Sequence, residues 1–232
     1  MVLYLSVFLI LTGLTGIYSV TTVTEVSVKA GDSISIPCLY DQSYVNHVKY
    51  LCRGYYYRHC SYAVKTDQQS SGKFLISDDK KLKIFTVTIK DVTDEDTDFW
   101  CVVEIDGGGD DRAYFHLSVT RGVSSLYVDH QEVTGFIGEH VTITCYCQNS
   151  GEAKWCRVGG PCVSGTEGSI DGTTVMLDRS SSRVLRVTVS RLRMEDSGWY
   201  WCLEGDLQMP VQISVRERPT TGKFCPSAFT MR

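Results

Sequence analysis

Two stretches decide the fold, residues 99–101 (FWC) and residues 195–202 (EDSGWYWC), because each brings an aromatic pair directly onto a cysteine. Upstream of each lies a run that ends in another cysteine: residues 26–38 (VSVKAGDSISIPC) correspond to residues 133–145 (VTGFIGEHVTITC). Both runs hold a glycine turn and then alternating apolar residues, so the apolar side chains and the cysteine share one face of a strand. No long apolar stripe of period 3.6 appears in the sequence. The sequence therefore predicts an all-β chain with two similar units.

The cysteines form two kinds of pair in each unit. The members of the first kind are about 60 residues apart, lie on inward-facing strand positions, and enclose a C-strand segment, as in an immunoglobulin β-sandwich with a disulfide between its sheets. The second kind is short-range and suits a staple that joins strand C to the following strand. The expected disulfides are Cys38–Cys101, Cys52–Cys60, Cys145–Cys202 and Cys156–Cys162.

Ten cysteines in 232 residues indicate an oxidising compartment, and the paired C-x2-C or H-x3-H spacings of zinc sites are missing. Residues 2–14 form an apolar run followed by small and polar residues, which predicts a signal peptide at residues 1–19. An uncleaved anchor is the alternative, although the run is short for a membrane span of ~20 residues. The chain is thus expected to be extracellular: secreted as written, or at the plasma membrane if a full-length product adds a transmembrane segment.

Composition and motifs exclude several functions. The net charge of −4 provides no broad positive field, so no nucleic acid is expected as a partner. The five histidines lie in no motif with a nucleophile, and neither G-x-S-x-G nor H-E-x-x-H occurs. We therefore expect a binding protein, not an enzyme, and one without a cofactor.

Several motifs carry a resemblance to a known family: residues 35–40 (SIPCLY), 49–52 (KYLC), 154–156 (KWC) and 195–202, together with the second cysteine pairs. Over roughly residues 21–216 the chain resembles the polymeric immunoglobulin receptor family and the related leukocyte immunoglobulin-like receptors, with the two-domain layout of the fish members.

The resemblance and the repeat together imply two tandem variable-type (V-type) β-sandwiches. The expected organisation is a first domain at residues 20–120, a linker at 121–125, a second domain at 126–216 and a polar tail at 217–232.

The first domain departs from the family pattern at Leu51 and at Phe99, which occupies the tyrosine-corner position two residues before Cys101 and lacks the hydroxyl. Leu51 stands where a tryptophan usually packs on the disulfide, and we expect Trp100 and Tyr50 to replace part of that ring. Lys73, at the start of strand D, is expected to pair with Glu95 near strand F.

Candidate ligand-binding residues lie in three loops of the first domain, since V-type domains carry function on loops. Tyrosine and arginine anchor many interfaces, although the three tyrosines between Cys52 and Cys60 could instead only cover the second sheet. The candidates are Tyr40, Asp41, Tyr44, Asn46 and His47 in the B–C loop; Arg53, Tyr55, Tyr56, Tyr57 and Arg58 in or beside the stapled loop; and Asp106, Asp110, Asp111 and Arg112 in the F–G loop.

The resemblance implies that the B–C loop binds polymeric immunoglobulin. The alternatives are a receptor for phospholipid headgroups or pathogen surfaces, with or without a metal ion, and a soluble decoy or adhesion module. The acidic F–G loop offers oxygen ligands of the kind that calcium prefers, but it lacks the D-x-D-x-D-G order, so the sequence predicts no metal site.

Two cysteines are left over. Cys147 could replace Cys145 in its disulfide or bond to Cys225, Cys225 could join a partner chain in a disulfide-linked dimer, or both thiols could be free.

Overall fold

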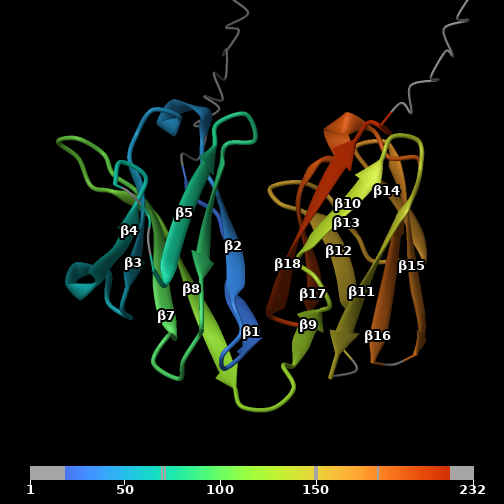
Figure 1. Ribbon diagram of the computed structural model, residues 1–232, viewed down its shortest axis with the longest axis horizontal. Coiled ribbons are helices and arrows are strands. Elements are labelled where there is room, and N and C mark those ends of the chain that lie inside the picture. Colours follow the sequence, from blue (N-terminus) through green and yellow to red (C-terminus); the bar gives the residue numbers. More distant parts are fainter. Residues whose placement is uncertain (1–18, 69, 71, 149–150, 182, 220–232) are drawn as a thin grey trace, which may run out of the picture.

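The computed structural model describes residues 19–68, 70, 72–148, 151–181 and 183–219. Two β-sandwiches lie side by side, joined by a loop at the lower edge of Figure 1. The predicted signal peptide and Cys225 lie outside the described residues. No helix in the described part is long and apolar enough to cross a membrane.

Domain 1 is a sandwich of eight strands, which pack a three-stranded sheet in the order β2-β6-β5 against strands β1-β8-β7-β3-β4. Strand β1 runs parallel to β8, whereas the other pairs within the domain are antiparallel. Its elements are β1 (Glu25–Lys29), β2 (Ile34–Leu39), η1 (Gln42–Tyr44), β3 (Lys49–Arg53), η2 (Tyr57–His59), β4 (Ser61–Lys65), β5 (Phe74–Asp79), β6 (Ile84–Ile89), β7 (Asp98–Val103) and β8 (Asp111–Thr120).

Domain 2 repeats this plan, with β14-β15-β16-β11-β9 packed against β13-β12-β17-β18 and with β10 parallel to β18. The 3-10 turn η3 precedes β17. The elements of domain 2 are β9 (Leu126–Val128), β10 (Glu132–Phe136), β11 (Val141–Cys147), β12 (Ala153–Arg157), β13 (Cys162–Val163), β14 (Glu167–Ile170), β15 (Thr173–Ser181), β16 (Val184–Val189), η3 (Met194–Asp196), β17 (Gly198–Glu204) and β18 (Leu207–Arg216).

The cysteine predictions are confirmed, because all four expected disulfides are present. Two of them join the sheets of a sandwich, and two staple β3 to β4 and β12 to β13. Since Cys145 bonds to Cys202, Cys147 does not replace it; the Cys147 thiol is buried and forms no disulfide with any described residue. Burial, and then the nearby Glu204 charge, raise the pKa of this thiol to about 11.

The two domains contact each other through both polar and apolar groups. Strand β1 forms a parallel bridge to β18, so the sheets of both domains join into one of 10 strands. The Gln131 side chain bridges the domains, accepting from the Ser35 amide at 2.8 Å and donating to the Ser35 and Pro210 carbonyls at 3.0 Å. Gly159 lies against Leu39 so closely that a Cβ there would meet the leucine methyl at 2.3 Å.

The expectation about the domain 1 core is wrong in its choice of rings. Leu51 is buried at the register position opposite Cys101, as predicted, but Tyr50 and Trp100 lie on the outer face of the sheet. The core is filled by phenylalanines instead: Phe99 stacks on Phe115 with ring centroids 5.5 Å apart. Alternation explains this, because neighbours of an inward-facing residue in a strand must point outward.

The expected partner of Lys73 is also wrong. Its ammonium pairs with Asp96, a fully buried carboxylate, and Glu95 lies beside Arg53 at 3.6 Å. Asp96 is the residue of the turn that points inward, and its other carboxylate oxygen lies 3.5 Å from the Arg53 guanidinium. Solvent can hydrate Glu95, so the half-buried Lys73 gains more from the buried carboxylate.

Candidate functional site

The stapled loop of domain 1 runs from β3 through η2 to β4 and is held at both ends by Cys52–Cys60. Gly54 is the second residue after Cys52 and has φ +137. A Cβ there would lie 3.2 Å from the Cys60 Cα, so the close approach of the two ends of the loop requires glycine. The Gly54 carbonyl accepts a hydrogen bond from the indole of Trp100 at 2.9 Å. The loop is therefore fixed to the sheet below it.

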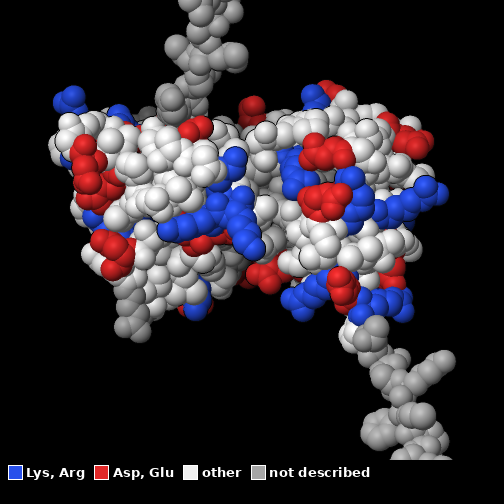
Figure 2. Space-filling model, turned by 90° about the horizontal axis from the view of Figure 1, so that it is seen from above, with Lys and Arg blue, Asp and Glu red and all other residues white. Residues whose placement is uncertain are grey.

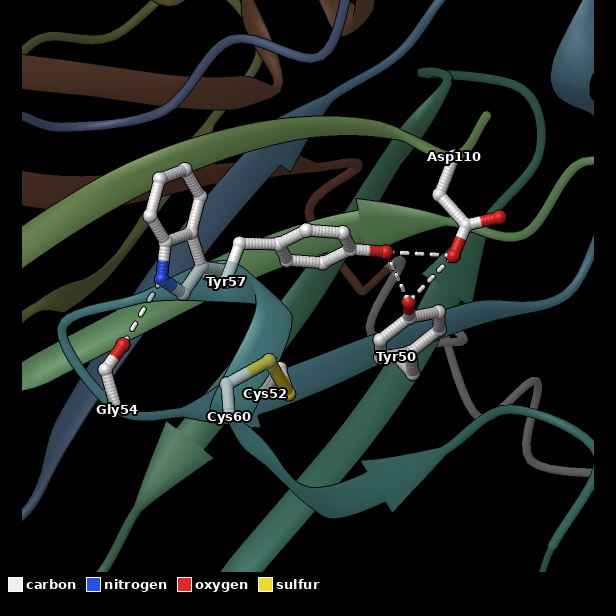
Figure 3. The surroundings of a disulfide bond; sticks show 7 residues. Tyr50, Cys52, Gly54, Tyr57, Cys60 and Asp110 are labelled. Atoms are coloured by element: carbon white, nitrogen blue, oxygen red, sulfur yellow. Dashed lines mark hydrogen bonds between the residues drawn. A yellow bond between two sulfur atoms is a disulfide. The ribbon is translucent and has the colours of Figure 1, made fainter. Parts of the chain in front are cut away.

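A buried network ties this loop to the F–G loop (Figure 3). The hydroxyls of Tyr50 and Tyr57 each donate to the same Asp110 oxygen at 2.6 Å, and the phenol oxygens lie 2.8 Å apart. The other Asp110 oxygen accepts from the Ile105 amide at 3.1 Å. Burial opposes ionisation of Asp110, but these donors outweigh it and hold its pKa below the ordinary value. Burial and the same carboxylate raise the pKa of Tyr57.

The sequence left open whether the tyrosines of the stapled loop face solvent or cover the sheet, and the loop contains both kinds. Tyr57 is half-buried over the sheet, whereas Tyr55 and Tyr56 are 60% and 69% exposed. Together with Trp100 and Tyr114 these rings line a hollow of about 350 Å³. We call the five residues Tyr55, Tyr56, Tyr57, Trp100 and Tyr114 the aromatic face.

A basic margin borders the aromatic face. The guanidinium of Arg112 lies 4.2 Å from the centre of the Tyr57 ring, a cation–π contact, and donates to the Asp110 carbonyl at 3.0 Å. Arg58, His59 and Arg112 line a second hollow of about 440 Å³ with Tyr56 and Tyr57.

The B–C loop forms a separate site at the end of domain 1, where η1 makes a 3-10 turn. The Asp41 carboxylate caps this turn by accepting from the amide and the hydroxyl of Ser43, both at 2.8 Å. These two hydrogen bonds lower the pKa of Asp41. The rings of Tyr44 and His47 meet edge to face at 5.5 Å, and Asn46 is exposed. Figure 2 shows this end of the molecule, with Lys and Arg side chains near the middle and Asp and Glu among them.

The buried ammonium of Lys49 supports the B–C loop from the side of the core. Lys49 is fully buried, and its ammonium contacts Asp78 at 3.0 Å and donates to the Val45 carbonyl at 3.1 Å. Tyr40 is 2% exposed, donates to Asp78 at 2.7 Å, and has its ring 4.3 Å from the Lys49 ammonium. Tyr40 therefore shapes the loop and is not itself available to a ligand.

The remaining candidate residues divide between surface and framework. Asp106 is exposed at the tip of the F–G loop, and Asp111 is half-buried. Arg53 faces the E–F turn, where it donates to the Glu95 carbonyl at 2.8 Å, away from the loops. Among the described residues no group of three or more His, Cys, Asp or Glu could hold a metal ion, and Asp110 is bonded to the two tyrosines.

Trp100 and Tyr114 are surface residues of the site that were not among the candidates predicted from the sequence. Trp100 precedes the inward-facing Cys101, and Tyr114 lies opposite Trp100 in the β7–β8 register. Period-two alternation, applied to both strands, would have placed the two rings on the outer face of the sheet.

Two V-type sandwiches, each with an inter-sheet disulfide and a C–C′ staple, define an immunoglobulin-domain protein. The chain is a homologue of the polymeric immunoglobulin receptors and the CMRF35-like molecules. This homology supports an immunoglobulin-domain ectodomain of the immune-receptor kind, and it is consistent with a place outside the cell or at its surface.

The similarity is distributed as follows. The polymeric immunoglobulin receptor of Mus musculus is 28% identical over 185 residues, 74% of this chain and 24% of that protein, so the chain spans about a quarter of it. CMRF35-like molecule 1 of Homo sapiens is 33% identical over 112 residues, 44% of this chain and 38% of that protein. Among solved structures, the teleost fish polymeric Ig receptor ectodomain is 32% identical, covering 86% of this chain and 99% of that chain, with a TM-score of 0.41. No protein-family model matches the chain.

Proposed function

We propose that domain 1 binds polymeric immunoglobulin and that the B–C loop makes the central contact. The similarity to polymeric immunoglobulin receptors supports the ligand class. The observation that carries the proposal is the pre-organised B–C loop: Asp41 caps its turn, and Lys49 and Tyr40 hold it from below. A loop already fixed in one conformation loses little conformational entropy when it binds a partner.

The surface of this loop is suited to a protein partner. Gln42, Ser43 and Asn46 are exposed and offer hydrogen-bonding groups, while Tyr44 and His47 are half-buried beside them. Polar groups around a half-buried aromatic core are the usual arrangement of a protein–protein contact. Binding to phospholipid headgroups is the competing function, and the experiment below includes it as an outcome.

The test measures binding of the secreted chain to immobilised polymeric immunoglobulin and to anionic phospholipid vesicles, each with calcium and with a chelator. Asp41→Ala removes the cap, and Asn46→Ala removes an exposed contact. We expect each variant to bind immunoglobulin at least about tenfold more weakly, with unchanged sensitivity to chelator. Lys90→Ala, an exposed residue in the β6–β7 turn, is the control. Wild-type affinity in both B–C variants, or binding only to vesicles, would overturn the proposal.

A further inference from the structure

The aromatic face and its basic margin are not used by the B–C loop. They lie on the outer side of the sheet β8-β7-β3-β4, whereas the B–C loop lies at one end of the sandwich (Figure 1). A face this rich in exposed tyrosine on a soluble domain indicates an interaction site.

The face has the shape of two adjoining shallow hollows that share Tyr56 and Tyr57. Tyr55 stands nearly perpendicular to both of its neighbours, at 87° to Tyr56 and 84° to Tyr114. The rings therefore form separate walls of the hollow, and the side chains of Tyr55 and Tyr56 are exposed to a ligand. Volumes of about 350 and 440 Å³ match a small ligand, and neither hollow is a deep channel for an acyl chain.

The chemistry of the walls favours a ligand that is apolar on one side and hydroxylated on its edges. An aromatic ring face is negative, so it attracts the polarised C–H groups on the flat side of a sugar ring. The hydroxyls of Tyr55 and Tyr56 have no hydrogen-bond partner among the described residues, and both can bond to sugar hydroxyls. Tyr57 is already bonded to Asp110, so it holds its position when a ligand arrives.

The charge of the margin favours an acidic ligand. Arg58 and Arg112 form no ion pair with any described residue, and His59 lines the same hollow as both arginines. The nearby Asp110 carboxylate is bonded by Tyr50, Tyr57 and Ile105, and faces them instead of the hollow. The Arg112 guanidinium lies 4.2 Å from the Tyr57 ring centre on an exposed residue, and a guanidinium can bind a carboxylate through two parallel hydrogen bonds.

We infer that the aromatic face binds a sugar that carries a carboxylate, with the pyranose ring on the tyrosines and the acid group on Arg112. Terminal sialic acid and uronic acid residues have this chemistry. The site is independent of the proposed immunoglobulin contact, because the B–C loop shares no residue with it.

The test is titration of the secreted chain with 3′-sialyllactose, with a glucuronate disaccharide and with neutral lactose, followed by calorimetry and saturation-transfer NMR. At least one acidic sugar should bind, with lactose at least about tenfold weaker, since a hydrogen bond between charged groups is worth about one such factor. The two acidic ligands distinguish the sources of the acid group. Equal binding of lactose, or no binding of any sugar, would overturn the inference.

Matched variants separate this site from the immunoglobulin contact. Arg112→Ala and Tyr56→Ala alter exposed side chains, so both should fold, and each should lower acidic-sugar affinity about tenfold or more. Arg112→Lys should recover part of the loss, while Asp41→Ala and Lys90→Ala should leave sugar binding unchanged. Immunoglobulin treated with sialidase should still bind the wild-type chain through the B–C loop. If Tyr56→Ala abolished immunoglobulin binding while no sugar bound, the face would be a protein contact, and the inference would be wrong.

Discussion

The two domains carry the same short disulfide but use the loop that it closes in opposite ways. In domain 1 the loop between Cys52 and Cys60 holds three tyrosines and faces solvent. In domain 2 the loop is two residues shorter, and Gly159, at φ +70, packs on Leu39 of domain 1. The same short disulfide therefore supports the exposed aromatic face in domain 1 and a contact between the domains in domain 2.

The outer faces of the sheets show the same contrast. Trp100 lies opposite Tyr114 in domain 1, and Trp201 lies opposite Pro210 at the matching positions of domain 2. Trp201 is buried, whereas Trp100 is half-buried under the exposed tyrosines. A homologous position can thus be framework in one domain and surface in the other, so a binding site is identified from its neighbours and not from its alignment.

The largest expected effect is on the core of domain 2. Trp155 is fully buried and stacks on Tyr200 with ring centroids 5.3 Å apart, so Trp155→Ala should cost about 3–5 kcal/mol of unfolding free energy. Leu51→Ala, at the matching position of domain 1, should cost about 2–5 kcal/mol. Urea unfolding measures the total loss of unfolding free energy, and hydrogen exchange shows which domain is destabilised. A loss below about 1 kcal/mol for Trp155→Ala would show that the ring is not the centre of this core.

The ion pair between Lys73 and the buried Asp96 should make domain 1 the more sensitive to acid. Burial opposes ionisation of Asp96, but the Lys73 ammonium and the Thr93 amide and hydroxyl outweigh it and lower its pKa. A lowered folded-state pKa gives stability that is present above the unfolded pKa of about 4 and is lost as the pH falls through the lower, folded value. Asp96→Asn should therefore cost about 3 kcal/mol at pH 7 and progressively less below pH 4.

The measurement is urea unfolding from pH 7 down to pH 2, with hydrogen exchange to follow domain 1. Lys90→Ala, an exposed lysine, serves as the control for a general charge effect. A difference between wild type and Asp96→Asn that stayed constant over this range would mean that the charge on Asp96 is not the source of the stability.

Much of the fold could be predicted from sequence, because it depends on local patterns. Alternation and cysteine spacing were enough for the two sandwiches and for all four disulfides. The partner of Lys73 could not be obtained this way, since the choice between Glu95 and Asp96 depends on which carboxylate the turn buries.

The candidate site was predicted less completely, for a similar reason. The tyrosines of the stapled loop were identified from composition, but their support by Asp110 requires the F–G loop to approach from more than 50 residues away, at a separation of 53 from Tyr57. Tyr40 was expected on the surface and is buried, because the Lys49–Asp78 pair draws its hydroxyl inward. Contacts between distant loops are set by tertiary packing and leave no periodic signal in the sequence.

The two staples should cost similar stability when removed but have different effects on binding. Loop-closure entropy gives about 2 kcal/mol for either short disulfide, so Cys52→Ser/Cys60→Ser and Cys156→Ser/Cys162→Ser should lower stability almost equally. Only the domain 1 variant should speed hydrogen exchange at residues 55–59 and weaken ligand binding at the aromatic face. If the domain 2 variant weakened that binding equally, the staple would act through the domain junction and the contrast between the loops would fail.

The smallest effect concerns a single hydroxyl that only domain 2 has. Tyr200 donates to the Asp196 carbonyl at 2.9 Å across the E–F turn, while Phe99 occupies the matching position, two residues before the cysteine, in domain 1. Tyr200→Phe should cost about 1 kcal/mol, the net value of one hydrogen bond, or roughly 4–8 °C in the thermal midpoint of a domain this size. Phe99→Tyr is the reciprocal test. The added hydroxyl should stabilise domain 1 by part of this energy, because it can donate a hydrogen bond to the Asp96 carbonyl. Phe99 is fully buried and stacked on Phe115. If Phe99→Tyr lowered the unfolding free energy by more than about 2 kcal/mol, the phenylalanine core would have no room for the hydroxyl. The two corners would then differ in packing as well as in sequence.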